Sequence, residues 1–287
     1  MSERLSDIVE RIDNMHQLDA VVTAMRGIAA SHVQQSRALI AGIDAYTAVV
    51  SRAIGEALTL TTQQAPEPTA KLRRPGLVLF AAEQGFAGSF SSRIIDEAER
   101  TVGVQLGQAH LMMIGTRGIG IAAERGLKPA WTAAMANRID SVPTVANRIA
   151  DALFESVAKG EVSEVNVFYC CTDEERSLHV RHTRLLPLEL ETFHPTGPGI
   201  PPLATLPPDV LLARLTDEYI YARLCDAAMH SFAAENEART QAMSSASNNI
   251  DKALNELVQR EHNVRQEEIT AEILELTVGN EAQSANR

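Results

Sequence analysis

The chain has 287 residues, of which 45% are hydrophobic and 22% charged, so it is long enough for one or two ordinary globular domains. Its formal net charge of -11 excludes a general nucleic-acid binder, because such proteins gather a surplus of Lys and Arg on one face. Only 4% of the residues are aromatic, and this composition favours helices packed through small and aliphatic side chains.

A long helix is predicted for the N-terminal segment. Apolar residues recur every three or four positions from Leu5 to Leu58, and no proline occurs before Pro66. This heptad-like spacing predicts a helix about 80 Å long, too long to be covered within one compact globule. The first 13 residues, MSERLSDIVERID, are charged and lack the apolar core of a secretory signal. We also expect no membrane-spanning helix, because no unbroken run of about 18 apolar residues occurs.

The middle of the chain has the pattern of an α/β domain. Pro-rich segments at 61–76 and 193–209 bound it, and short apolar runs alternate between them with helix-like segments. Strands are expected at LVLFAA (77–82), AHLMMIG (109–115), VNVFYCC (165–171) and LHVRHTRLLPL (178–188), and helices at 89–102, 117–126 and 143–159. This alternation predicts a Rossmann-like domain at 75–195 with a mostly parallel sheet, whose last strand lies at an edge.

The helical spacing resumes after Pro208, and neither Pro nor Gly occurs again before Gly279. This predicts a second long helix of about 105 Å. Two such helices flanking one domain cover their apolar seams most simply by pairing antiparallel, so we expect a coiled coil of residues 1–60 and 209–280. The second helix outruns the first by about 15 residues, which leaves an apolar stripe that predicts another protein around it. An ordinary two-helix stalk would have the same periodicity.

The stretch LVLFAAEQGFAGSFSSRI (77–94) has the outline of a phosphate-binding loop: a strand, a turn with Gly85 and Gly88, and the start of a helix. It lacks both the Gly-Lys-Ser/Thr ending of a P-loop and the G-x-G-x-x-G spacing. We therefore interpret the two glycines as relieving backbone strain at a strand-to-helix turn, with no nucleotide bound. The alternative is an α/β nucleotide-binding enzyme with helical extensions, in which Glu83, Ser89 or Ser91 would do the chemistry.

Metal and thiol chemistry are also considered. The candidates are four possible metal ligands and three thiols: His179, His182, His194, Glu189, Cys170, Cys171 and Cys225. His179 and His182 lie three apart on a predicted strand and so project from opposite faces, which favours a solvated edge strand over a metal site. The cysteines have neither a disulfide framework nor zinc-site spacing, so we expect reduced thiols. No catalytic, cofactor or metal site is predicted.

The two long helices and the loop between them resemble a known family. The segment ENEARTQAMSSASNNIDKALNELVQREHNVRQEEITAEILEL (235–276) closely resembles the C-terminal helix of the γ subunit of F-type ATP synthases. TAMRGIAASH (23–32) is similar to the family's Ala-Met-Lys-Met-Val-Ala-Ala-Ser-Lys segment, and AAEQGFAGSFSSRI (81–94) occupies the place of its glycine-rich turn. The resemblance covers nearly the whole chain, in the right order.

This resemblance implies a rotor that couples proton or sodium ion translocation to ATP synthesis or hydrolysis on the α and β subunits. The paired helices would sit inside the α/β hexamer, and the α/β domain would rest on the c-ring with the ε subunit. The chain would be a peripheral protein on the cytoplasmic side of the bacterial inner membrane, in contact with it only through the membrane sector. The resemblance implies no catalytic residue and no cofactor. The positions implied for contact with the hexamer are Met25, Arg26, Arg265, Gln266 and Thr270.

The chain departs from the family pattern in its first helix. The usual basic run is replaced by Ala20, Val21, Val22 and Thr23, and the Lys after Ala-Ala-Ser is His32. Those cations face acidic loops of β in the family, so Arg26 remains the single candidate for that contact. Such divergence resembles a variant bacterial F-type ATPase.

A coiled-coil scaffold unrelated to this family is a third possibility. It would not explain the set Arg265, Gln266 and Thr270. The Cys of the family's turn is Ala87 here, and no plant-type cysteine insertion is present, so thiol control is not expected.

Overall fold

The computed structural model describes residues 4–60, 74–173, 175, 177–194 and 203–284. The chain divides into two compact units, one of Met1–Ile28 with Thr240–Arg287 and the other of Ala29–Arg239. Helix α1 (Leu5–Leu58) and helix α5 (Pro208–Ser284) each contribute to both units. Residues 61–73 of the first Pro-rich segment and 195–202 of the second lie outside the described residues.

The larger unit contains a five-stranded sheet in the order β3-β2-β1-β4-β5. Its strands are β1 (Arg74–Phe80), β2 (His110–Ile114), β3 (Trp131–Ala133), β4 (Val162–Thr172) and β5 (Leu178–Leu186). All neighbouring pairs are parallel except β4 with β5, which is antiparallel and places β5 at an edge. The expected mostly parallel sheet is therefore confirmed. The sequence pattern missed β3, because three residues are too few to show a strand period.

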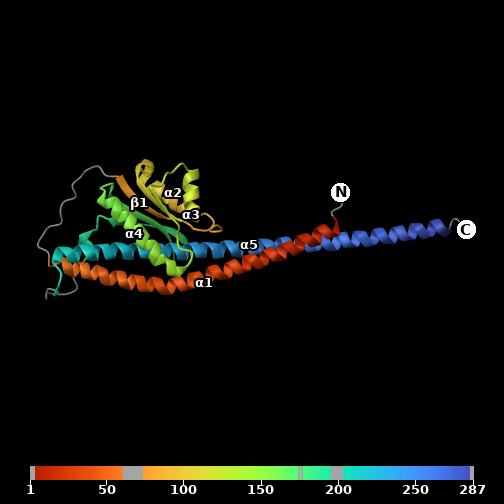
Figure 1. The fold of residues 1–287 in the computed structure, drawn as a ribbon. Coiled ribbons are helices and arrows are strands. Elements are labelled where there is room, and N and C mark those ends of the chain that lie inside the picture. The colour runs from red at the N-terminus through yellow and green to blue at the C-terminus, as the bar shows by residue number, and fades with distance from the viewer. Residues whose placement is uncertain (1–3, 61–73, 174, 176, 195–202, 285–287) are drawn as a thin grey trace. The chain divides into compact units, whose positions relative to one another are not determined.

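Helices cover both faces of this sheet (Figure 1). They are α2 (Phe90–Val102), α3 (Thr116–Glu124) and α4 (Val142–Ala158), with short 3-10 helices at Gly103–Gln108, Ile139–Ser141 and Leu190–Thr192. Successive β1 side chains point to opposite faces: Leu77 and Leu79 pack with α2 and α3, while Val78 and Phe80 pack with α4 and α5. A parallel strand buried on both faces reads as an unbroken apolar run, as LVLF does.

Within the larger unit, α5 lies against both the sheet and α1. Small side chains of α5 such as Ala222 and Ala228 are almost fully buried, at 1% and 0% exposed. Val50 and Ile54 of α1 pack with Leu212 and Leu215 of α5 in a separate apolar cluster. A helix with apolar or small residues on all sides is typical of such an enclosed position.

In the smaller unit, α1 and α5 pair antiparallel around a core of Val22, Met243 and Ile250. The Ser247 hydroxyl donates to Asp19 Oδ1 at 3.2 Å and fixes their register. Counted from that bond at equal rise, Leu5 is level with about residue 261, so about 23 residues of α5 extend past the end of α1. This exceeds the expected overhang of about 15 residues, in part because α5 continues through Gly279 to Ser284. An interior helical glycine costs only about 1 kcal/mol.

One helix passes a length and composition test for crossing a membrane, contrary to the expectation from unbroken runs. It is α1, which contains an 18-residue window with a mean hydropathy of 1.3, of which 17% is buried. A few charged residues interrupt its apolar ones, so the average is high without a continuous run. Core helices of globular proteins pass the same test. Here Ile40 and Ile43 of α1 pack against the main apolar core of the larger unit.

Candidate functional site

The loop between β1 and α2 lies at the carboxyl end of the sheet, where open α/β sheets bind their ligands. The first side chain in this loop with a specific role is Glu83. Its carboxylate accepts hydrogen bonds from the Thr116 N–H at 2.9 Å, the Thr116 hydroxyl at 2.7 Å and the Met135 N–H at 2.7 Å. Because Thr116 begins α3, this carboxylate occupies the helix N-terminus that would attract a phosphate.

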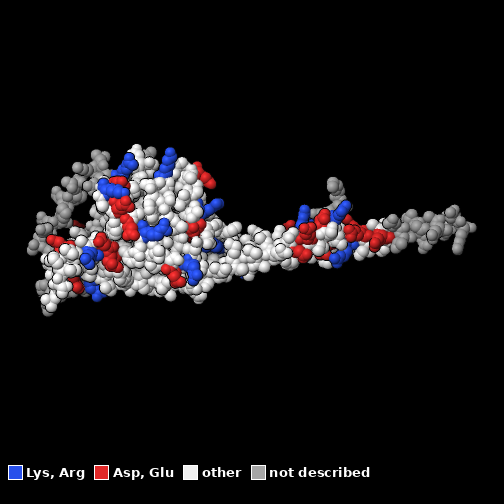
Figure 2. Space-filling view, in the orientation of Figure 1, with Lys and Arg blue, Asp and Glu red and all other residues white. Residues whose placement is uncertain are grey.

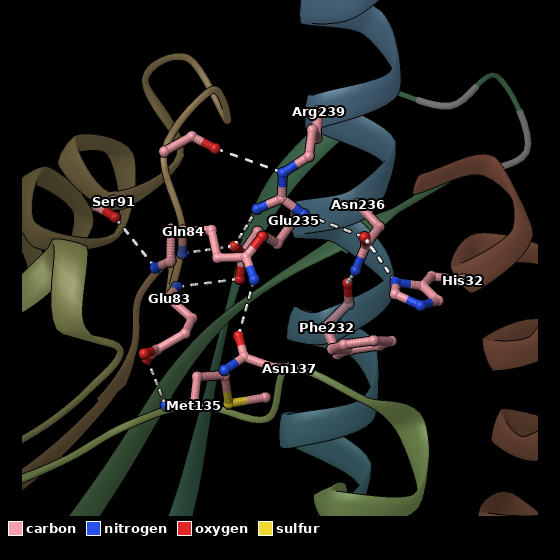
Figure 3. Close-up of polar contacts among 12 residues, drawn as sticks. His32, Glu83, Gln84, Ser91, Met135, Asn137, Phe232, Glu235, Asn236 and Arg239 are labelled. Carbon is pink, nitrogen blue, oxygen red and sulfur yellow. Dashed lines mark hydrogen bonds and ion pairs between the residues drawn. The ribbon is translucent and has the colours of Figure 1, made fainter. Parts of the chain in front are cut away.

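A second carboxylate occupies the backbone donors of the loop itself (Figure 3). Glu235 of α5 accepts the N–H groups of Glu83 and Gln84 at 3.2 and 3.1 Å. It also receives a hydrogen bond from Arg239 Nη2 at 2.6 Å, and these two side chains are only 4% and 8% exposed. In a phosphate-binding loop such N–H groups point at the ligand. Here the Glu235 carboxylate already accepts the N–H groups of Glu83 and Gln84, so they are not free to bind a phosphate. This arrangement favours a structural turn over a nucleotide-binding loop.

Arg239 joins the loop to both long helices. Its Nε donates to the Gly85 carbonyl at 3.4 Å and its Nη1 to Asn236 Oδ1 at 3.1 Å. Asn236 Oδ1 also lies 3.3 Å from His32 Nδ1 of α1, and the His32 and Phe232 ring centroids are 5.4 Å apart. His32 is therefore held by a partly buried contact with Asn236 in the same polar network. Figure 3 shows these contacts converging from α1, α5 and the loop.

The loop glycines differ from each other in their backbone. Positive φ occurs at Gly88, at 57°, and at Phe86, at 61°. Strain relief therefore applies to Gly88 and not to Gly85, whose carbonyl is held by Arg239 instead. Phe86 is a non-glycine residue in this left-handed region and its side chain is 66% exposed.

The serines proposed for an enzymatic alternative hold the loop and the helix that follows it. Ser91 Oγ accepts the Ala82 N–H at 3.1 Å, and Ser89 Oγ accepts Arg93 Nε at 3.1 Å. Gln84 Nε2 adds a bond to Asn137 Oδ1 at 3.0 Å. Together with Glu83, all three residues named for chemistry thus have structural partners.

The five positions named for partner contact lie in the smaller unit. Met25 packs on the core around Val22, and Arg26 is half-buried. Arg265, Gln266 and Thr270 are exposed on α5, beyond the level at which α1 begins. Arg265 Nη2 donates to Glu261 Oε1 at 2.6 Å, and the Thr270 hydroxyl donates to the Gln266 carbonyl at 2.7 Å. The register separates these three residues from Met25 and Arg26 along the helix pair.

The same end of α5 exposes large apolar side chains. Ile269, Ile273 and Leu274 are 51%, 58% and 59% exposed. Ile269 and Ile273 are four residues apart and so lie on one side of the helix. A contiguous exposed apolar stripe marks an interaction surface.

The histidine candidates separate as expected. His179 Nε2 lies 2.9 Å from Cys171 Sγ, whereas His182 stacks on Phe168 and lies 2.9 Å from Asn166 Oδ1. Phe168 and Cys171 face opposite sides of β4, so the two histidines do too. Within the described ranges, no group of three His, Cys, Asp or Glu side chains suits a metal. The three cysteines are free and buried, and burial raises the pKa of the Cys171 and Cys225 thiols.

Glu235 and Arg239 were not among the site residues expected from the sequence, although both belong to the segment that resembles the family. The only sequence signal for this pair was its spacing: a Glu and an Arg four residues apart can form an ion pair on any helix, so the spacing does not indicate burial. Their burial against the loop depends on contacts about 150 positions away in the chain.

On the face seen in Figure 2, acidic and basic side chains are interspersed.

Comparison with known proteins gives consistent matches along the chain. A family model described as ATP synthase matches residues 4–283. The "ATP synthase gamma chain" of Leifsonia xyli is 29% identical, covering 99% of each chain, and that of Beutenbergia cavernae is 29% identical, covering 96% of this chain and 97% of the relative.

Solved structures match the fold. A chain of the Euglena gracilis mitochondrial ATP synthase has a TM-score of 0.66 at 12% identity, covering 98% of this chain and 95% of that chain. A chain of the Tetrahymena thermophila central stalk and c-ring has a TM-score of 0.53 at 18% identity, covering 79% of this chain and 99% of that chain.

Proposed function

The chain belongs to the ATP synthase family as a γ chain, the non-catalytic subunit of the rotor stalk, and we propose that it couples ion flow to ATP chemistry through two separate surfaces. One surface is the end of α5 that extends past α1, which contacts the α and β subunits. The other is the α/β domain, which contacts the ε subunit and the c-ring. ATP is made or hydrolysed on its partners.

The observation that supports this role most directly is the extension of α5 past the end of α1. Its apolar side chains Ile269 and Ile273 are more than half exposed in the single chain. Enclosing them in a sleeve of partner subunits removes that apolar area from water, which stabilises the assembly. Apolar contacts have no fixed direction, so a helix enclosed in this way can rotate relative to the surrounding subunits without a permanent bond to any one of them.

The polar contact with the hexamer is proposed to centre on Arg265, Gln266 and Thr270. Arg265 is 53% exposed and bonds Glu261 through one of its nitrogens, so the rest of its planar fork faces solvent. A guanidinium suits a carboxylate or backbone carbonyls of a facing loop. Because the first helix lacks the family's lysines, Met25, Arg26 and this cluster take a larger share of the contact.

The subunit is peripheral and lies on the cytoplasmic side. We propose that it is held at the bacterial inner membrane only through the membrane sector. The apolar window of α1 is then a packing surface for α5 in the larger unit.

The proposed contact is tested by Arg265→Ala combined with Gln266→Ala in the assembled complex of α, β and this chain. A charged hydrogen bond buried at the interface is worth about 1.5–3 kcal/mol. We expect the complex to assemble and its ATPase turnover to fall several-fold. Ser89→Ala, in the glycine loop, is the control and should leave turnover unchanged.

Two outcomes would count against the proposal. Unchanged turnover in the double variant, with assembly intact, would remove this cluster from the coupling. A loss of turnover with Ser89→Ala alone would point to chemistry in the loop.

A further inference from the structure

The larger unit contains a cavity of about 540 Å³ that the coupling role does not use. It opens between α1, the segment leading into α4, and α5. Its volume falls in the range of about 300–1,000 Å³ that is usual for small-molecule sites. Its lining is predominantly apolar and includes Ile43, Tyr46, Asp140, Val142, Tyr221 and Met229.

The cavity exists because small residues face it from the two long helices. A Cβ added to Gly42 of α1 would meet no atom within 4 Å, so a side chain there would have open space. Ala222 of α5 is buried and contributes only a methyl group to the wall. Val142 and Met229, at 0% and 3% exposed, make the deep part apolar. An apolar ligand in this space would gain contacts that the surrounding side chains do not make with each other.

The polar groups of the cavity favour a cation. The Tyr46 hydroxyl donates to the Glu218 carboxylate, and burial, together with this hydrogen bond, raises the pKa of Tyr46 to about 12. Asp140 lies in the lining, and its only ion-pair partner among the described residues is Arg138, at 3.9 Å, with both side chains about 80% exposed. Such a long, solvated pair contributes little and leaves the carboxylate able to accept another cation. The lining contains no Lys or Arg.

We propose that this cavity binds a small lipophilic cation, with its apolar body between Ile43, Val142 and Met229 and its ammonium group at Asp140. The rings of Tyr46 and Tyr221 add π faces that attract a cation. An anion of the same shape would meet Asp140 and, through Tyr46, Glu218. The site therefore selects by charge as well as by apolar volume, and it is independent of the contact with the hexamer.

The test uses the full chain and a photoreactive amine, a trifluoromethyl-diazirinyl benzylamine, with the labelled peptides identified by mass spectrometry. We expect labelling on α1 around Tyr46 and on α5 around Met229. 4-Phenylbutylamine should compete with it, whereas 4-phenylbutyrate should be at least about tenfold less effective because its charge is repelled. The neutral 4-phenylbutanol should lie between them.

Two variants locate the site. Gly42→Leu adds a side chain at a position where a Cβ meets no atom within 4 Å, and it removes a glycine from a helix interior, so it should abolish labelling while the melting temperature stays the same or rises. Gly120→Leu on α3 is the matched control, since a Cβ there also meets nothing within 4 Å, and it should label normally. Asp140→Asn should reduce the advantage of the amine over the alcohol.

The proposal is overturned by any of three results. These are labelling that persists in Gly42→Leu, equal competition by the amine and the butyrate, and labelling confined to the exposed apolar end of α5. The last result would mean that the probe binds the surface meant for a protein partner.

Discussion

At the scale of single residues, the buried pair of Glu235 and Arg239 links the loop after β1 to α5. A buried carboxylate is tolerated only when its lone pairs are satisfied, and Glu235 has the loop amides of Glu83 and Gln84 as well as the guanidinium. Arg239 also holds the Gly85 carbonyl. The pair therefore fixes the loop to α5, so that the α/β domain and the shaft helix are joined by charge-assisted bonds as well as by apolar packing.

Removing Arg239 should be far more damaging than removing an exposed arginine with the same spacing. Arg239→Ala leaves Glu235 buried without its cation, which typically costs about 3–5 kcal/mol. Arg265→Ala breaks a Glu-Arg pair at the same i, i+4 spacing on the same helix, but there the arginine side chain is 53% exposed and the glutamate 18%, and roughly 0.3–0.5 kcal/mol is usual for a solvated helix pair. Urea unfolding of the two variants measures the difference. Equal destabilisation would mean that the buried pair has no special role in holding the loop.

At the scale of elements, the sheet has the topology of a cofactor-binding domain, but the positions where such a domain binds its ligand are occupied by side chains of the same chain. The N-terminus of α3 and the loop after β1 are both satisfied by carboxylates from the chain, Glu83 and Glu235. A nucleotide phosphate would have to displace one of them and would meet negative charge instead of open N–H donors. The internal carboxylates thus explain how a fold that binds nucleotides in other proteins can occur here without nucleotide binding.

The isolated chain should accordingly bind neither ATP nor ADP with useful affinity. Titration calorimetry of the full chain with each nucleotide and Mg²⁺ should show heats no larger than dilution. Binding in the micromolar range would revive the enzymatic alternative, and Glu83→Ala would then be examined to find whether the nucleotide uses the N-terminus of α3.

At the scale of the whole molecule, the chain exposes surface that its own fold does not cover. The exposed side chains of Ile269, Ile273 and Leu274 lie on the part of α5 that extends past the level of Leu5, where α1 begins. A free chain can hide such a stripe only by pairing with another copy. Its behaviour in isolation is therefore expected to differ from its behaviour in the assembly.

We expect the isolated chain to self-associate, and this association to disappear on co-expression with α and β. Ile273→Glu should weaken the self-association, because it places a charge in the stripe. Val49→Glu changes an equally exposed valine of α1 and should leave the association in place. Light scattering coupled to size exclusion measures all four cases. A monodisperse monomer with no affinity for α and β would contradict the rotor role.

The sequence by itself determined the family and the presence of two long helices flanking an α/β sheet, since long-period apolar spacing, strand-length runs and the identities from Glu235 to Ile273 are local features. It also indicated that the last helix outruns the first, because the two lengths could be compared directly. Only the tertiary structure decided which side chains fill the carboxyl end of the sheet, that the positive-φ positions of the loop are Phe86 and Gly88, and that Gly42 lines a cavity. Those features depend on contacts between residues far apart in the chain, and a linear pattern contains no information on which distant groups will meet.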